Sequence, residues 1–264
     1  MIPQLESIKN IEKQYQTGEE PVMVLCSDLN PYICKYKRSG SPSYKLACEL
    51  IGSFFARTWG VRTPENAFVR IKENHWNGLP VSHILNVPSL GSKYMQGVID
   101  ISPSTYREMK PSAELLTSLL EIALLDIWLS NEDRNINNAN LMYELDKGRL
   151  VAIDFGCIFN TATFDYPLTQ LTVTDTILYS DLFRGMASGF KKTTIHKILE
   201  HLEKFYVKAI EKSAKQCEVL LMQLPEEWAV PTYIVDAKLQ ELFTDRWIKD
   251  SWENFNENVY EHIK

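Results

Sequence analysis

The stretch that decides the fold is Leu124–Phe159, which reads LLDIWLSNEDRNINNANLMYELDKGRLVAIDFGCIF. Its apolar beginning predicts the end of a buried helix, and a polar loop with Asp133, Arg134 and Asn138 follows. Two short apolar runs around an Asp-Lys-Gly turn then predict a hairpin. Asp154 stands at the end of the second run. Because a hairpin reverses the chain, we expect Asp154 and the polar loop to meet at one end of it.

Two carboxylates and an amide in this arrangement suit the transfer of a phosphoryl group. Such transfer needs a carboxylate at the acceptor hydroxyl, ligands for a metal ion and a cation at the nucleotide phosphates. Asp133 is the candidate for the acceptor side. Asn138 and Asp154 offer the oxygen ligands that Mg²⁺ prefers. The sequence therefore predicts a magnesium and phosphate site in this stretch.

The chain before this stretch predicts strands and one long helix. Turn-forming residues at Ser27–Pro31 separate two apolar runs and indicate a hairpin. The expected elements are a short helix over 5–15, strands over 22–25, 32–37, 66–71 and 81–85, and a helix over 43–59. Residues 72–98 are rich in Gly and Pro and predict an irregular segment that ends in an interlobe linker.

The chain after residue 98 predicts mainly helices. Ser112 can cap a helix over 112–129 that is apolar nearly all round and therefore buried. Further helices are expected over 193–223 and 236–261. This order of elements favours an α+β protein of two lobes, a β-rich N-lobe over 1–98 and a mostly helical C-lobe over 99–264. The site then lies in the cleft between the lobes.

Two lysines of the second predicted strand are candidates for the cation of the site. Strand alternation puts Lys35 and Lys37 on the same face, so the pattern leaves both open. Glu49 lies on the helix over 43–59, where it is either a surface carboxylate or the partner of one of these lysines. Arg134 is either exposed or paired with a carboxylate that orients the polar loop.

Composition excludes several classes of protein. The net charge of −6, from 28 basic and 34 acidic side chains, disfavours non-specific binding to nucleic acid or to a membrane surface. The five cysteines are scattered without a CxxC pair, which disfavours zinc and indicates reduced thiols. No run approaches about 18 apolar residues, and the first residues lack the apolar core of a signal peptide. We expect a cytoplasmic protein with no membrane span.

A calcium-binding loop is the strongest alternative for the polar loop. Asp133, Asn135, Asn137 and Glu144 occupy positions 1, 3, 5 and 12 of an EF-hand loop. However, Asn138 stands at the central glycine position. An EF-hand also needs a helix after Glu144, whereas a turn and a β-rich run follow. These features favour the phosphoryl-transfer interpretation.

Several of these segments resemble the HipA-like kinase family. NEDRNINN is similar to the family's catalytic loop and, more distantly, to that of type II phosphatidylinositol kinases, and IDFG is similar to the metal-binding Asp after a strand. YICKYK and LACELIGSFFARTWGVRTP resemble the family's lysine strand and the helix after it. The resemblance implies a two-lobed protein-kinase-like fold that binds ATP and Mg²⁺.

The same resemblance implies a role for individual residues. Lys35 would bind the nucleotide phosphates, and Glu49 would hold Lys35. No GxGxxG motif precedes Lys35, so the turn with Ser27 and Asn30 would have to cover the phosphates. Asp133 would act on the acceptor, with Asn138 and Asp154 on the metal. The acceptor implied is a protein Ser or Thr, including one of the chain itself, and an antitoxin-like protein partner is also implied.

A non-catalytic role is the alternative function. A protein of this fold could bind a nucleotide or a protein partner without transferring a phosphoryl group. Against this, the sequence retains Lys35, Asp133, Asn138 and Asp154 together. We therefore expect an active serine/threonine kinase.

Overall fold

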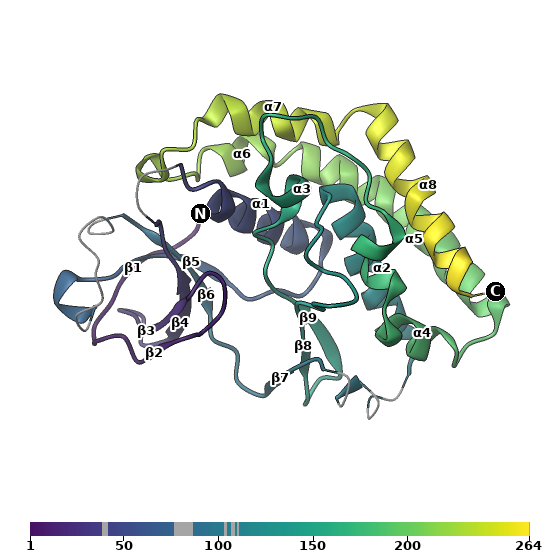
Figure 1. Ribbon diagram of the computed structural model, residues 1–264, viewed down its shortest axis with the longest axis horizontal. Coiled ribbons are helices and arrows are strands. Elements are labelled where there is room, and N and C mark those ends of the chain that lie inside the picture. The colour runs from purple at the N-terminus through teal and green to yellow at the C-terminus, as the bar shows by residue number, and fades with distance from the viewer. Residues whose placement is uncertain (39–41, 77–86, 103–104, 107–108, 110, 264) are drawn as a thin grey trace.

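A β-rich end and a helical end make up the molecule. The computed structural model describes residues 1–38, 42–76, 87–102, 105–106, 109 and 111–263. Figure 1 shows the larger sheet at one end, near the N-terminus, and the helices α2, α4, α5 and α8 towards the other end, where the chain finishes. This is the α+β, two-lobed arrangement that the sequence predicts.

The larger sheet has six strands in the order β1-β5-β6-β4-β3-β2. Its strands are β1 (Gln4–Glu6), β2 (Lys13–Gln14), β3 (Val22–Leu25), β4 (Pro31–Lys35), β5 (Asn66–Arg70) and β6 (Ser89–Lys93). All neighbours pair antiparallel except β1 and β5, which are parallel. Valines of β3 and β5 pack on Trp76, which follows the 3₁₀ turn η1 (Glu73–His75), in a small core on one face. The sheet presents Lys35 at the end of β4.

Two expectations for this end of the chain are wrong. Residues 5–15 form no helix but contribute to β1 and β2, edge strands too short for a recognisable sequence pattern. Residues 72–98 are not irregular throughout, because they contain the interior strand β6. Gly91 allows β6 to approach its neighbours, since a Cβ there would lie 2.8 Å from Val69 Cγ2. The strand predicted over 81–85 lies outside the described residues.

The second sheet positions the polar loop. Its strands are β7 (Val98–Asp100), β8 (Leu141–Glu144) and β9 (Arg149–Ala152), all antiparallel. Leu141 pairs with Ala152, so the polar loop before β8 and Asp154 after β9 lie at the same end of the hairpin. A backbone hydrogen bond of 3.1 Å from Ile153 N to Asn140 O continues this pairing. The predicted lobe boundary at residue 98 falls on the first residue of β7.

The helical region contains a buried central helix and a long outer layer. Its helices are α2 (Ala113–Leu129), α3 (Ile158–Ala162), α4 (Asp181–Ala187), α5 (Lys192–Ala214), α6 (Cys217–Leu221), α7 (Thr232–Leu242) and α8 (Asp245–His262), with 3₁₀ turns η3 (Val173–Asp175), η4 (Ile177–Tyr179) and η5 (Glu226–Trp228). Ser112 caps α2, as predicted, and accepts a hydrogen bond from Leu115 N. The α3 turn is left-handed from Phe159 onwards.

Both long helices predicted near the C-terminus are interrupted. The helix expected over 193–223 divides into α5 and α6 near Lys215. The helix expected over 236–261 divides into α7 and α8, because Thr244 caps α8 and Trp128 Nε1 donates to Leu242 O at the end of α7. The indole of Trp247 in turn donates to Trp128 O at 2.9 Å. Tertiary packing on α2 thus sets a break that local periodicity does not reveal.

Helix α1 (Tyr44–Trp59) connects the two lobes. It ends at Gly60, whose φ of 85° is the left-handed conformation that glycine favours. Its Phe55 and Trp59 rings lie 5.1 and 5.3 Å from the Trp128 ring of α2, within one continuous hydrophobic core. The helix is therefore held from the C-lobe as well as from the sheet.

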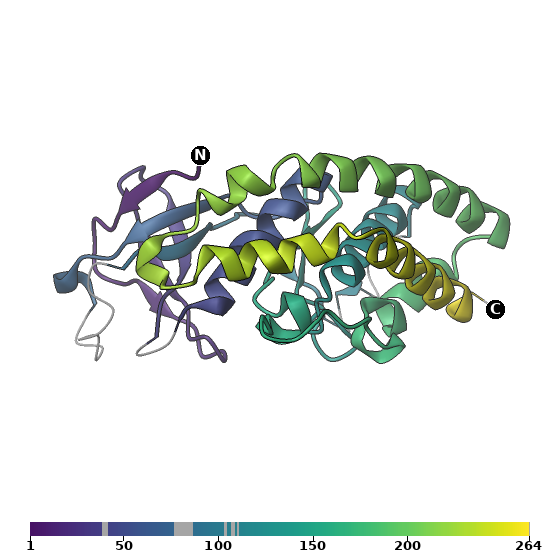
Figure 2. The same cartoon turned by 90° about the horizontal axis from the view of Figure 1, so that it is seen from above.

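The segment around η5 returns from the C-lobe to the sheet. Figure 2 shows the region of α6 and α7 beside α1 and reaching the sheet. Trp228 is fully buried, donates through Nε1 to Pro88 O at 2.7 Å, and packs edge-to-face on Phe68 of β5. Its carbonyl accepts from Ser43 N, just before α1. This contact joins the sheet, α1 and the last third of the chain.

Two general expectations concern the state of the cysteines and the presence of a membrane-spanning helix. All five cysteines are unpaired, and Cys26, Cys34, Cys48 and Cys217 are buried. Among the helices of the described ranges, none combines the length and apolar character needed to cross a bilayer.

Candidate active site

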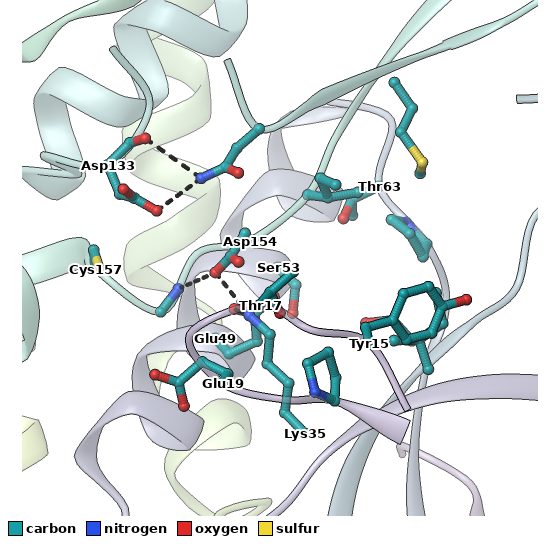
Figure 3. A pocket seen from close by; sticks show the side chains of 18 of the residues that line it. Tyr15, Thr17, Glu19, Lys35, Glu49, Ser53, Thr63, Asp133, Asp154 and Cys157 are labelled. Atoms are coloured by element: carbon teal, nitrogen blue, oxygen red, sulfur yellow. Dashed lines mark hydrogen bonds and ion pairs between the residues drawn. The ribbon is translucent and has the colours of Figure 1, made fainter. Parts of the chain in front are cut away.

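A cavity of about 610 Å³ lies between the larger sheet, α1 and the β8–β9 hairpin. Residues from both lobes line it, including Lys35 and Glu49 from one side and Asp133, Asn138 and Asp154 from the other. Its apolar part includes Ile33, Met95, Met142 and Ile153. Figure 3 shows Asp133 and Cys157 on the left of the view, Tyr15 on the right, and Lys35 and Asp154 between them. The size is typical of a site for a small-molecule ligand.

Lys35 bridges two carboxylates from opposite lobes. Its Nζ lies 2.8 Å from Glu49 Oε2 on α1 and 2.7 Å from Asp154 Oδ1 (Figure 3). Glu49 is only 5% exposed, so this carboxylate faces the interior and not solvent. The structure thus brings Lys35 and Glu49 together, as the sequence predicts, and adds Asp154 to the pair.

Lys35 and Asp154 stabilise each other's charged forms, whereas burial raises the pKa of Glu49 against the effect of Lys35. Burial would lower the pKa of Lys35, but the carboxylates of Glu49 and Asp154 raise it above its usual value. Burial would raise the pKa of Asp154, but the Lys35 ammonium holds it below its usual range. Both groups are therefore charged at neutral pH.

Lys37, the other candidate from the strand pattern, lies elsewhere. Its Nζ donates to Glu227 O at 2.9 Å on the η5 turn. It is not among the residues that line the cavity. Strand alternation would put both lysines on one face, but β4 ends at Lys35, so Lys37 lies outside the strand.

Asp133 is oriented by two amides of its own loop. Asn138 Nδ2 and Asn140 Nδ2 donate to Asp133 Oδ2 at 3.1 and 2.9 Å. Further amides close the loop on itself, because Asn135 Nδ2 donates to Glu132 O and Asn135 Oδ1 accepts from Asn137 N. The asparagines thus keep an open loop in one conformation. Sequence reasoning did not identify Asn140 as a partner of Asp133.

Arg134 anchors the loop from beneath. Its side chain is fully buried, and Nε donates to Asp126 Oδ2 of α2 at 2.7 Å. Its Nη1 donates to Asn140 O and, at 3.0 Å, to Ile153 O, next to Asp154. Burial raises the pKa of Asp126, while Arg134 acts in the opposite direction. Of the two alternatives for Arg134, pairing with a carboxylate is confirmed, although the partner Asp126 was not predicted.

Asp154 has a strained backbone. Its φ is 58°, in the left-handed region that residues other than glycine rarely adopt. The following Phe155 N donates to Glu49 Oε2 at 2.9 Å. Gly52 of α1 permits this close approach, because a Cβ there would lie 2.3 Å from Phe155 Cβ. The segment Asp154–Gly156 is therefore packed against α1, and in this position the Asp154 side chain contacts Lys35.

Ser27 and Asn30 do not lie at the cavity, and this expectation is wrong. Val22 pairs with Cys34, so the start of β3 is beside Lys35 and the turn after β3 is at the far end of the hairpin. There Ser27 N donates to Glu6 O, and Asn30 Nδ2 donates to Asp28. The loop between β2 and β3 lines the cavity instead, with Thr17, Gly18 and Glu19. The sequence offered no motif for this loop.

The residues present suit a magnesium ion that is shared with a phosphate ligand. Mg²⁺ is commonly held by one or two protein oxygens, with water and phosphate oxygens completing the shell. The Asp154 carboxylate and the Asn138 side-chain oxygen provide such ligands at one cavity. Within the described ranges, no group of three or more His, Cys, Asp or Glu side chains is arranged to hold a metal ion by itself.

The EF-hand alternative is contradicted by the structure. Glu144, the required ligand at position 12, lies in strand β8 and accepts from Lys147 Nζ at 2.7 Å. A strand and a turn, not a helix, follow the loop. The loop therefore lacks the second helix of the motif.

Comparisons with known proteins identify the family and the fold of the chain. The profile of the HipA-like kinase family matches residues 8–260. The proinflammatory kinase CtkA of Helicobacter pylori has a similar structure, with a TM-score of 0.54, 12% identity, and coverage of 97% of this chain and 99% of that chain. The Golgi casein kinase superposes with a TM-score of 0.49 at 11% identity, over 99% of this chain and 74% of that chain. No curated protein matches the chain in sequence.

The family match spans nearly the whole chain, and the similarity to CtkA shows a kinase fold. This chain is therefore a member of the HipA-like kinase family.

Proposed function

We propose that the protein is an ATP- and Mg²⁺-dependent kinase that transfers the γ-phosphoryl group to a protein Ser or Thr hydroxyl, including one of its own. The observation that supports this most strongly is the meeting of Lys35, Glu49, Asp154 and Asp133 around one cavity. Phosphoryl transfer depends mainly on positioning and on charge neutralisation. These residues supply a cation, a carboxylate for metal and a carboxylate for the acceptor.

The nucleotide would be divided between two parts of the cavity. The apolar part around Ile33, Met95 and Met142 suits a purine base. Lys35, at the end of β4, suits the phosphates. A Lys–Glu pair of this kind holds the ammonium in place, and here Glu49 has that contact at 2.8 Å.

Asn138 and Asp154 are the residues that would hold magnesium, and the bound ion would neutralise charge on the phosphates. The acceptor oxygen forms a bond to the γ-phosphorus as the bond from that phosphorus to the β–γ bridging oxygen breaks, so ADP leaves. Asp133 accepts the proton of the acceptor hydroxyl. The amides of Asn138 and Asn140 keep its carboxylate in one orientation.

A phosphoproteomic comparison tests both the reaction and its acceptor. Cells that express the wild-type chain should gain phosphoserine or phosphothreonine sites that are missing with Asp133→Ala, because general acid–base groups commonly contribute roughly 10²–10⁴-fold to rates. Asp146→Ala, in the exposed turn between β8 and β9, is the matched control and should behave as wild type. Nucleotide binding by the purified chain, without any Asp133-dependent site, would favour the non-catalytic alternative.

Three finer points belong to the same proposal. The five unpaired cysteines fit a reducing, cytoplasmic location. An antitoxin-like protein partner is proposed from family membership only. With a net charge of −6, direct binding to nucleic acid forms no part of the proposal.

A further inference from the structure

A second lysine lines the cavity and is paired with an acid of the β2–β3 loop. Lys45 lies in the first turn of α1, and its Nζ is 2.8 Å from Glu19 Oε1. Both residues line the cavity, and Figure 3 shows Glu19 on the same side of the view as Cys157 and Asp133. The side chains are 52% and 36% exposed, so a ligand can reach the pair.

Lys45 stands next to the metal-binding segment. Its carbonyl oxygen would lie 3.9 Å from a Cβ placed on Gly156. The hydrogen bond that Lys45 Nζ donates to Glu19 is the largest influence that raises the pKa of Lys45, and the charge of Asp154 also contributes. Lys45 is thus within electrostatic range of Asp154 while it is hydrogen-bonded to Glu19.

The cavity has few basic side chains that are free to bind the phosphates of a nucleotide. Among the described residues, the basic side chains that line it are Lys35, Lys45 and Lys93. Lys35 already contacts two carboxylates, and Lys93 of β6 pairs with Tyr32, three residues along β4 from Lys35. A triphosphate that enters beside Glu19 would meet an additional negative charge. Lys45 is the cation whose partner a phosphate could replace.

We propose that Lys45 is a second phosphate-binding residue and that the Glu19 carboxylate competes with phosphate for it. This inference rests on the proposed function, because its ligand is the triphosphate of a nucleotide. The terminal phosphates replace the Glu19 carboxylate at Lys45 Nζ, and the β2–β3 loop is released from α1. Exposed ion pairs contribute little net stability, so the exchange costs little. A phosphate with two or more charges is the stronger partner for an ammonium group.

If the Lys45–Glu19 pair were only a structural salt bridge, mutations of the two residues would affect nucleotide affinity differently than in a phosphate site. If the pair served only to hold the loop, removing either partner would loosen the loop and shift nucleotide affinity in the same direction. As a phosphate site with a competing acid, the pair responds in opposite directions. Loss of Lys45 removes a ligand contact, whereas loss of the Glu19 charge removes a competitor.

Calorimetric titration of the purified full chain with adenosine, ADP and a non-hydrolysable ATP analogue, in the presence of Mg²⁺, separates these accounts. Lys45→Met should weaken binding of the analogue roughly tenfold and ADP less. Glu19→Gln should strengthen binding of the analogue several-fold. Adenosine should bind all variants alike, which also shows that they are folded.

The neighbouring pair Arg38–Glu20 provides the control. Its atoms are 3.1 Å apart, both side chains are 47% exposed, and neither residue lines the cavity. Arg38→Met and Glu20→Gln should therefore leave affinity for the analogue unchanged. If Lys45→Met and Glu19→Gln shift this affinity in the same direction, or not at all, while the wild type binds, only this inference is overturned. If the wild type binds no nucleotide, the proposed function is overturned as well.

Discussion

Lys35 and Lys37 show that the tertiary surroundings of a residue determine whether it belongs to the site. They are two residues apart, but β4 ends at Lys35, and only Lys35 reaches the carboxylates of Glu49 and Asp154. Lys37 contacts the Glu227 carbonyl on the surface. No local pattern distinguishes them, since Asp154 is 119 residues away from Lys35 in the chain.

The two lysines make a matched pair for mutation. Lys35→Met should abolish measurable binding of Mg-ATP, because it removes the cation for the phosphates and leaves Glu49 buried without its partner. Lys37→Met should leave binding near the wild-type value. Fluorescence or calorimetric titration of both variants checks this. Loss of binding in Lys37→Met with retention in Lys35→Met would show that the assignment is wrong.

The thiol of Cys157 reports on the environment of the cavity. Burial, together with the nearby Asp133 charge, raises the pKa of Cys157 to about 11. The thiolate is therefore scarce at neutral pH, and its fraction rises about tenfold per pH unit until the pH nears that value. Alkylation of Cys157 by iodoacetamide, followed by mass spectrometry, should still be accelerating at pH 9. A rate that levels off below pH 9 would indicate an ordinary, solvated thiol.

At the scale of elements, the pattern of the chain predicts those that carry their own signal. Strands β3, β4, β5, β8 and β9 and helices α1 and α2 lie within a few residues of their predicted positions. Their apolar periodicity and the Ser112 and Gly60 caps are local features. Strand β6 is different, because Leu90 is its single large apolar residue and the other residues of Ser89–Lys93 are small or polar.

The candidate site was predictable to a similar degree. The sequence identified five residues that line one cavity, because they belong to recognisable segments: Lys35, Glu49, Asp133, Asn138 and Asp154. The partners that hold them, such as Asp126 for Arg134, depend on tertiary contacts. The turn at Ser27–Pro31 was expected to cover the site, but the β2–β3 loop lines the cavity instead, because the pairing register that excludes this turn cannot be read from the residues.

The η5 turn is the element whose contribution can be measured most simply. Trp228→Ala should lower the free energy of unfolding by about 3–5 kcal/mol, because a large buried side chain is removed. Tyr233→Ala on α7, which is 75% exposed, should change it by less than about 0.5 kcal/mol. Urea denaturation of both variants tests the role of the turn. A cost below about 1 kcal/mol for Trp228→Ala would contradict a bracing role.

The whole molecule is built so that its two lobes meet over the site. Helix α1 carries Glu49 and packs on α2 through Trp59 and Trp128, while Phe155 N donates to Glu49. The η5 turn joins the C-terminal third to the sheet through Trp228. The contacts of Lys35 with Glu49 and Asp154 therefore depend on packing from both lobes.

Transfer of radiolabel from γ-labelled ATP in the presence of Mg²⁺ tests the central claim most directly. The wild-type chain should label itself or a protein acceptor, and chelation of the metal should stop the labelling. Asp154→Asn should reduce the labelling by roughly 10²-fold or more, because the proposed metal site loses its carboxylate ligand. Equal labelling by wild type and Asp154→Asn, or none by the wild type with any acceptor fraction, would contradict the account.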